Sequence, residues 1–153
     1  MSLQNTYVED NVIWLIAEDE ADILNLVATM CQVWGHSPIT FESGQKVWNW
    51  LDEVEAGKYQ GKMPEFILMD IRMPGKRGNE VAQRMRTVPA FQQTPIALMT
   101  AYALSTDEKS AMMVSDGIDQ IIPKPLPGFE DLHKLLNQII QNKRADSQRS
   151  QPA

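Results

Sequence analysis

The 153-residue sequence predicts an α/β domain in which helices cover both faces of a five-stranded parallel sheet. Two observations lead to this fold class. Five short apolar runs alternate along the chain with stretches whose apolar residues recur at helical spacing. The runs are continuous rather than alternating, which is typical of strands buried on both faces. The length suits one domain, and the sequence has no internal repeat.

The predicted strands are the apolar runs themselves. The first, VIWLIA, ends in a run of acids, as expected for a buried strand that reaches the sheet edge. The third, EFILMD, ends on Asp70 just before the turn-forming residues MPG. In chain order the strands are expected at 12–17, 37–41, 65–70, 95–100 and 120–122.

The predicted helices follow the strands one by one. Ser43 caps the second helix, and Gly35 and Gly117 stop the first and the fourth. The first helix has five apolar residues at helical spacing: Ile23, Leu26, Val27, Met30 and Val33. The helices are expected at 22–34, 43–54, 79–87, 105–117 and 128–142.

The ends of the chain differ from its centre in composition. Residues 1–10 are expected to form an N-terminal extension, and residues 11–142 the domain. From 143 to 153 the sequence is polar and has no apolar period, which predicts a disordered C-terminal tail.

Charge and cysteine content restrict the class of protein. A net charge of −6 argues against binding to nucleic acid, which needs a basic surface. The single cysteine, Cys31, cannot form an internal disulfide and is expected to be a buried apolar residue in a reducing compartment. Neither a signal peptide nor a membrane-spanning run is visible, so a cytoplasmic protein without membrane contact is expected.

Polar side chains stand at the ends of four predicted strands. Glu18 and Asp19 follow the first, Asp70 ends the third, Thr100 ends the fourth and Lys124 follows the fifth. Because the carboxyl ends of parallel strands share one edge of a sheet, where α/β proteins bind ligands, these residues are expected to meet.

The expected cluster suits phosphoryl transfer. Three neighbouring carboxylates repel one another unless a cation intervenes, and Mg²⁺ prefers such oxygen ligands. Lys124 supplies a charge that can pair with a phosphoryl oxygen, and Thr100 supplies a hydroxyl donor. Asp70 is the expected nucleophile, which explains a carboxylate at the end of an apolar strand.

Four short motifs at matching strand ends together resemble the receiver domain of response regulators in two-component signalling. The resemblance covers residues 11–142 and implies a flavodoxin-like sheet with strand order 2-1-3-4-5. The motifs are Glu18-Asp19, Asp70 with Met73-Pro74 and Gly78, Thr100-Ala101, and Lys124-Pro125.

The resemblance also implies the role of each site residue. Asp70 would accept a phosphoryl group from the phosphohistidine of a sensor histidine kinase or a histidine phosphotransfer protein. Thr100 and Lys124 would bind the phosphoryl oxygens. The implied Mg²⁺ ligands are Glu18, Asp19, Asp70 and the backbone carbonyl of Arg72.

The same resemblance implies a signalling module rather than an enzyme. Its own chemistry would be limited to self-phosphorylation from small phosphodonors and self-dephosphorylation. Output would pass through a surface that binds a downstream protein, or through a phosphorylation-dependent homodimer. Three positions depart from the common pattern: Glu18 where aspartate is frequent, Ile121 where an aromatic residue is frequent, and Pro123 directly before Lys124.

Three other functions match the sequence less well. A Mg²⁺-dependent aspartyl-phosphate phosphohydrolase of the haloacid dehalogenase type would need a second aspartate two residues after the nucleophile, and Arg72 stands there. A degenerate receiver, acting as a phosphorylation-independent binding module, would usually have lost an acid or the lysine. A nucleotide-binding protein would need a glycine-rich loop after the first strand, where the sequence has EDEAD.

Several residues are expected to be structural. His36 and His133 are far apart in sequence, lack metal-ligand spacing and are expected to be ordinary surface residues. Trp50 is expected nearer the core than Trp48, since the two cannot share one helix face.

Overall fold

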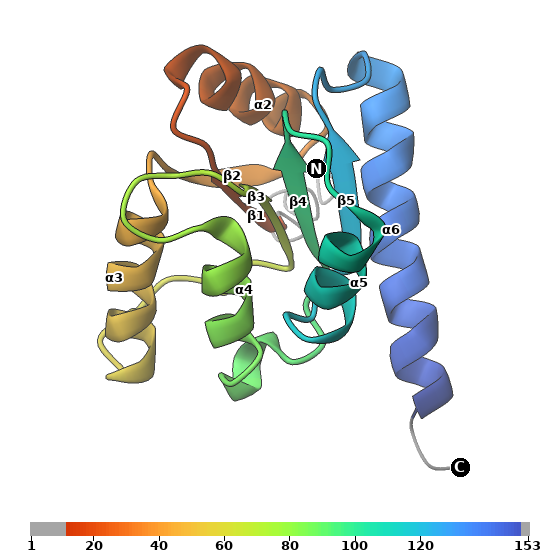
Figure 1. Ribbon diagram of the computed structural model, residues 1–153. Helices are drawn as coiled ribbons and strands as arrows, with labels where there is room; N and C mark the ends of the chain where they lie inside the picture. Colours follow the sequence, from red (N-terminus) through yellow and green to blue (C-terminus); the bar gives the residue numbers. More distant parts are fainter. Residues whose placement is uncertain (1–11, 151–153) are drawn as a thin grey trace.

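The computed structural model describes residues 12–150, with side chains to 148, and its elements form three layers (Figure 1). All five strands are parallel and lie in the order β2-β1-β3-β4-β5, which confirms the predicted fold class. The strands are β1 Ile13–Ala17, β2 Ser37–Phe41, β3 Phe66–Asp70, β4 Ile96–Thr100 and β5 Gln120–Pro123.

Five α-helices connect and follow these strands within the described residues. They are α2 Ala21–Val33, α3 Gly44–Glu55, α4 Gly78–Met85, α5 Thr106–Val114 and α6 Phe129–Ser150, with a 3₁₀ turn, η1, at Pro89–Phe91. Ser43 caps α3 as predicted, because its side chain accepts a hydrogen bond from the Lys46 amide.

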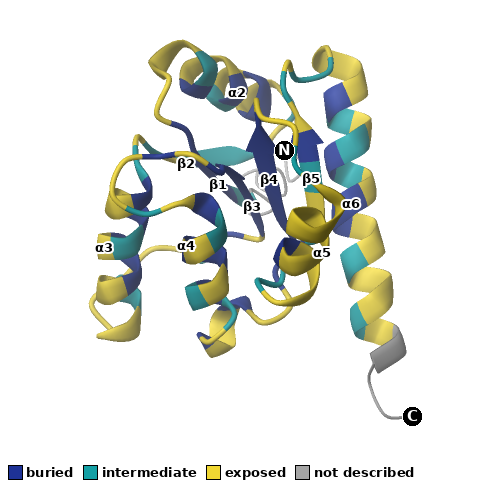
Figure 2. Cartoon of the chain, in the orientation of Figure 1, coloured by how far each residue is buried: buried dark blue, intermediate teal, exposed yellow. Residues whose placement is uncertain are grey.

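Two apolar cores lie on the two faces of the sheet. Helices α2 and α6 cover one face, and α3, α4 and α5 cover the other. Strands β3 and β4 are buried along their whole length (Figure 2), so their apolar runs carry no alternation. Helix α5 buries only Met112 among its residues, and Met113 is 44% exposed.

The first helix buries a narrower face than its sequence suggested. Its buried residues are Leu24, Val27, Met30 and Cys31, which confirms the burial of Cys31. Leu26 is 59% exposed and Val33 is 68% exposed, although both belong to the predicted apolar pattern. Helix α2 therefore has apolar residues on its outer side as well as toward the sheet.

The C-terminal tail predicted from residue 143 is wrong for the residues described, since α6 continues to Ser150. The contacts that accompany this extension are polar: Lys143 Nζ lies 3.0 Å from Asp119 Oδ1, and the Ser147 hydroxyl donates to the Gln93 side chain. Polar contacts of this kind leave no apolar period in the sequence, so the sequence pattern does not predict them. The predicted extension at 1–10 lies outside the described residues.

Truncation after Asn142 is expected to lower the thermal midpoint by about 2–4 °C, because it removes an ion pair worth about 1 kcal/mol. Lys143 and Asp119 are 19% and 20% exposed, so solvent screens this pair only partly. Thermal denaturation of the truncated and full chains measures the effect, and Lys143→Met should reproduce most of it. Equal midpoints would show that the end of α6 does not stabilise the domain.

One arginine joins several segments at the amino edge of the sheet. Arg86, which follows α4, donates to the carbonyl oxygens of Phe91, Thr94 and Gly117 and to the carboxylate of Asp119. The same carboxylate also accepts the backbone N–H of Ile96 at the start of β4, at 2.9 Å. This network holds the edge opposite to the predicted site.

The two histidines come together, contrary to the expectation of ordinary surface residues. His36 stacks on Trp14 with ring centroids 4.2 Å apart, and His133 stacks on Trp34 at 4.5 Å. The two imidazoles lie 6.5 Å apart, and the buried His36 Nδ1 has no hydrogen-bond partner. Burial, and then the charge of His133, lowers the pKa of His36.

Acidification should therefore destabilise the domain through His36. A lowered pKa means that the unfolded chain takes up the proton first, so this stability is complete above about pH 6.5 and is lost as the pH falls below it. His36→Phe keeps a ring against Trp14 but cannot titrate. Thermal midpoints between pH 8 and pH 5 should fall more for the wild type than for His36→Phe, and parallel curves would contradict the assignment.

Candidate functional site

The predicted acids meet at the carboxyl edge of the sheet. Glu18 directly follows β1, its backbone N–H donates to Phe41 of β2, and it is 1% exposed. Asp70 is the last residue of β3 and is 7% exposed, whereas Asp19 is exposed. One ligand oxygen from each of these three carboxylates lies within 4.8 Å of the others. The sheet alone brings them together, as the strand-end pattern predicted.

Lys124 reaches the same cluster from the far end of the sequence. Its Nζ lies 2.5 Å from Glu18 Oε1 and 3.3 Å from Asp70 Oδ1. Its backbone N–H donates to the Thr100 carbonyl at 2.7 Å, which fixes the start of the β5–α6 loop beside β4. The Lys124 side chain is 10% exposed, so its charge acts in a partly desolvated place.

Burial shifts the titration of the cluster. It raises the pKa of Asp70 and of Glu18 above their ordinary values, although Lys124 opposes both shifts. Burial lowers the pKa of Lys124, but the hydrogen bond to Glu18 and the charge of Asp70 outweigh it, so that pKa is raised. Three carboxylates face one ammonium, and the cluster keeps an excess of negative charge that suits a hard cation.

A small cavity of about 150 Å³ opens above Asp70. Asp19, Arg72, Tyr102 and Lys124 are among the residues that line it. The Arg72 guanidinium lies 3.9 Å from the centre of the Tyr102 ring, a cation–π pair at the mouth of the cavity. Arg72 therefore lines the cavity, and its predicted role as a metal ligand through the backbone carbonyl stays a prediction. Tyr102 was not predicted, because an exposed loop aromatic gives no periodic signal.

Thr100 lies at the end of β4 but faces a different cavity. It is 5% exposed, and its Oγ1 accepts the Tyr102 amide at 3.0 Å. Together with Leu104 and Ile121 it lines a cavity of about 160 Å³ beside α5. Thr100 thus lines this cavity, whereas Asp19, Asp70 and Lys124 line the one above Asp70.

Comparison with known proteins places this geometry in a family. The family model of the response regulator receiver domain matches residues 14–137. The chain belongs to the response regulator receiver domain family.

Relatives of this receiver domain are parts of longer proteins. Protein RcaC of Microchaete diplosiphon is 26% identical over 125 residues, covering 82% of this chain and 18% of RcaC. The phosphate regulon transcriptional regulatory protein PhoB of Pseudomonas aeruginosa is 25% identical over 134 residues, covering 88% of this chain and 54% of PhoB. The chain thus spans about half of PhoB and less than a fifth of RcaC.

Solved structures share the fold of this receiver domain. A CheY-like receiver domain protein from Methanospirillum hungatei has a TM-score of 0.71 at 19% identity, covering 90% of this chain and 99% of that one. The phosphorylated cyanobacterial phytochrome response regulator RcpA has a TM-score of 0.67 at 18% identity, covering 84% and 91%. No helix among residues 12–150 is both long and apolar enough to cross a bilayer.

Gly78 of the receiver domain lies directly under Asp70. A Cβ atom at position 78 would stand 2.3 Å from the Asp70 carbonyl oxygen, and the Gly78 N–H donates to the Ile71 carbonyl at 2.8 Å. Any side chain would push the start of α4 away from the end of β3. The absence of a side chain at position 78 therefore lets α4 begin in close contact with the end of β3.

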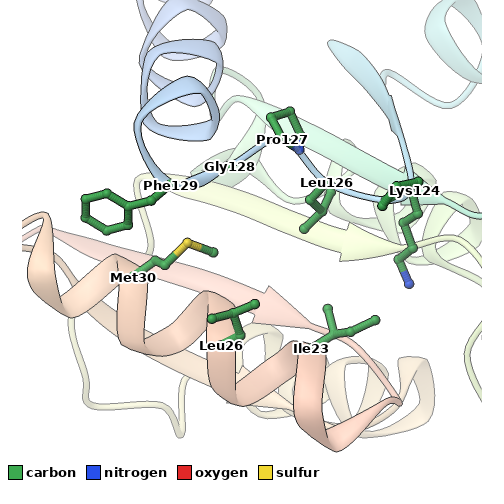
Figure 3. Close-up of a pocket in the computed structure, with 9 residues that line it drawn as sticks. Ile23, Leu26, Met30, Lys124, Leu126, Pro127, Gly128 and Phe129 are labelled. Atoms are coloured by element: carbon green, nitrogen blue, oxygen red, sulfur yellow. The ribbon is translucent and has the colours of Figure 1, made fainter.

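An apolar groove of about 530 Å³ lies between α2 and the segment that leads into α6 of the receiver domain (Figure 3). Ile23, Leu26 and Met30 of α2 form one wall, and residues 125–129 form the other. Lys124 lines both the groove and the cavity above Asp70, so the two adjoin at this residue. The groove was not predicted, because the outward apolar residues of α2 could not be told from its core residues.

Proposed function

We propose that this receiver domain is the phospho-acceptor of a two-component phosphorelay, with Asp70 as the residue phosphorylated. The observation that carries the proposal is the placement of Asp70: it is nearly buried at a strand end, faces the cavity, and has one oxygen 3.3 Å from Lys124 Nζ. A carboxylate held beside a fixed ammonium group at a cavity is placed to attack phosphorus, and the ammonium is placed to neutralise negative charge on the transferred phosphoryl group.

The proposed step transfers a phosphoryl group from nitrogen to oxygen. An Asp70 oxygen attacks the phosphorus of a phosphohistidine, the phosphorus–nitrogen bond breaks, and the donor imidazole keeps the electron pair. Lys124 pairs with a phosphoryl oxygen, and Thr100 would donate its hydroxyl to another after turning toward Asp70. Asp70 is thus the proposed phosphoryl acceptor, and Lys124 and Thr100 are the residues proposed to bind the phosphoryl oxygens.

The clustered oxygen donors fit a divalent cation. Glu18, Asp19 and Asp70 offer carboxylate oxygens within 4.8 Å of one another, and the backbone carbonyl of Arg72 is a further candidate ligand. When bound, Mg²⁺ would screen the phosphoryl oxygens from the negative carboxylates.

The phosphodonor is proposed to be a sensor histidine kinase or a histidine phosphotransfer protein. A donor protein must hold its histidine at the cavity, and the apolar groove between α2 and residues 125–129 adjoins that cavity at Lys124. An amphipathic helix placed there would rest on Ile23, Leu26 and Met30, which recur at helical spacing. GacS and BarA, which share sequence with this chain, are named as a sensor protein and a histidine-protein kinase.

Output is proposed to pass to a downstream protein or through a phosphorylation-dependent homodimer. Thr100 lines the cavity beside α5, where Leu104 and Ile121 also lie, so movement of its hydroxyl toward Asp70 would reshape that surface.

The proposed location is the cytoplasm. The thiol of Cys31 is buried, and burial raises its pKa to about 12, which fits a protein of the reducing cytoplasm.

Incubation with acetyl phosphate tests the proposal. Intact mass should show one phosphoryl group per chain when Mg²⁺ is present and none after chelation. Peptide mapping should locate the group on residue 70. Absence of labelling, or labelling that ignores Mg²⁺, would argue against the assignment.

Leu26→Asp should slow phosphorylation by a donor protein about tenfold or more, because a buried charge in the groove costs several kcal/mol against an apolar partner face. Acetyl phosphate needs no groove, so labelling from it should be unchanged. Val33→Asp is the matched control, since Val33 lies on the same helix, is 68% exposed and is not among the described residues that line the groove. Equal effects of the two variants on the donor reaction would exclude the groove as the donor surface.

A further inference from the structure

We infer that Gly44, the first residue of α3, is a positioning residue for the phosphorylation site and acts on it through the β3–α4 loop, residues 71–77. The inference rests on the proposed function, because it concerns the cavity in which Asp70 would be phosphorylated. Arg72 carries the effect, since it belongs to this loop and lines that cavity together with Asp70. Gly44 is not among the described residues that line the cavity, so its effect is indirect.

The β3–α4 loop rests on the first turn of α3. The Pro74 carbonyl accepts the backbone N–H of Gln45 at 3.2 Å. A Cβ atom at position 75 would lie 2.5 Å from the Cβ atom of Gln45, so the loop backbone is in close contact with the helix here. Met73 is buried in the same apolar core as Val47 of α3. A hydrogen bond and apolar packing therefore attach the loop to this helix.

The contact between helix and loop is tightest at Gly44. A Cβ atom at position 44 would stand 1.7 Å from the Lys76 carbonyl oxygen and 2.7 Å from its carbonyl carbon. Both are backbone atoms, so rotation of a side chain cannot make room. The φ of Gly44 is not positive, and alanine, which is the better helix former, could adopt the same backbone conformation. The space taken by the loop, and not the conformation of the helix, therefore requires glycine here.

A second contact holds the loop one turn further along α3. The Nζ atom of Lys76 lies 4.4 Å from the centre of the Trp48 ring, a cation–π contact between loop and helix. The guanidinium of Arg84, on α4, lies 4.5 Å from the centre of the same ring. Trp48 therefore joins α3 both to the loop and to α4, and either cation can be removed without the other.

Arg72 lies between the end of β3 and the part of the loop that contacts α3. The residue before it is hydrogen-bonded to β4, and the Pro74 carbonyl after it is hydrogen-bonded to α3. A displacement of residues 74–76 would thus move Arg72 before Asp70, because β3 is paired with a strand on each side. A guanidinium at the cavity can pair with the oxygens of an incoming phosphodonor, so its position affects the reaction.

Gly44→Ala tests the inference, and Gly35→Ala is the matched control. Gly35 has a φ of +93°, and an added Cβ would meet no atom within 4 Å beyond its chain neighbours, so alanine there strains the backbone without displacing another segment. The Tyr102 ring, 3.9 Å from the Arg72 guanidinium, shifts the side-chain proton resonances of Arg72, and NMR measures this ring-current shift without phosphorylation. The shift should be largely lost in Gly44→Ala and unchanged in Gly35→Ala.

Labelling by acetyl phosphate gives the second readout. It should slow about tenfold in Gly44→Ala, because a small displacement of a group at the site can cost that much or more. Gly35→Ala should keep the wild-type rate. Lys76→Met and Arg84→Met decide the question if Gly44→Ala does not fold. Lys76→Met detaches the loop from Trp48 and should reduce the Arg72 shift, whereas Arg84→Met should leave that shift unchanged.

Three results would overturn the inference. Gly44→Ala could keep the wild-type Arg72 shift, or it could lose the shift and still be labelled at the wild-type rate. The third result is an equal change of the shift within either pair of variants. Failure of the wild type to be labelled would instead count against the proposed function, and the NMR shifts would still decide whether Gly44 positions Arg72.

Discussion

Asp70→Asn should abolish phosphoryl incorporation while the domain stays folded. Asparagine has nearly the same shape, and its amide is not a nucleophile toward phosphorus. The variant should still expose the same cavity and the same Lys124. Intact mass after incubation with acetyl phosphate and Mg²⁺ measures the loss, and circular dichroism confirms the fold. Stoichiometric labelling of the variant would mean that another residue is the acceptor.

The same substitution should raise the thermal midpoint of the metal-free protein. Burial raises the pKa of Asp70, so the folded chain holds the proton more tightly than the unfolded chain does. The stability linked to that proton is complete below the ordinary pKa of 3.8 and is lost as the pH rises through the raised value. The advantage of Asp70→Asn should therefore be present at neutral pH and shrink in acid. An advantage that grows in acid would contradict the shift.

Arg86→Met should destabilise the domain by about 3–5 kcal/mol, or roughly 10 °C in midpoint. Its guanidinium is paired with Asp119, which is only 20% exposed, and it satisfies three backbone carbonyls as well. Removal takes the guanidinium away from these carbonyl oxygens and from the Asp119 carboxylate, which keeps Lys143 and the Ile96 N–H as partners. Urea denaturation at neutral pH measures the loss.

Arg84→Met is the matched control for this experiment. Arg84 precedes Arg86 by two residues and its side chain has the same 16% exposure. Its partners Asp52 and Glu55 are 62% and 46% exposed, so solvent can replace their ion pairs at a cost of about 1 kcal/mol or less. Comparable losses in the free energy of unfolding for the two variants would show that the Arg86 network stabilises the domain no more than the exposed ion pairs of Arg84 do.

The fold and the centre of the site could be predicted because their signals are local or topological. Continuous apolar runs identified the strands, since burial on both faces leaves no room for polar residues. Parallel pairing then sends every strand end to one edge, so the meeting of Asp19, Asp70 and Lys124 followed from the order of elements alone.

The remaining features depend on contacts between segments that carry no periodic signal. The extension of α6 beyond residue 142 is accompanied by polar contacts such as that between Lys143 and Asp119. The stacking of His36 on Trp14 brings together segments whose sequences show no relation. The exposure of Leu26 could not be predicted from the spacing of apolar residues, because α2 is apolar on two sides. In each case tertiary geometry, and not local pattern, decides the outcome.

The contact between Glu18 and Lys124 joins residues that are 106 positions apart in the chain. A chain still leaving the ribosome therefore carries Glu18, Asp19 and Asp70 before Lys124 has been synthesised. Until β5 has been synthesised and has paired with β4, the acids lack their internal cation, and phosphorylation of nascent chains should be suppressed. Only a receiver whose whole sheet has formed could then report a signal.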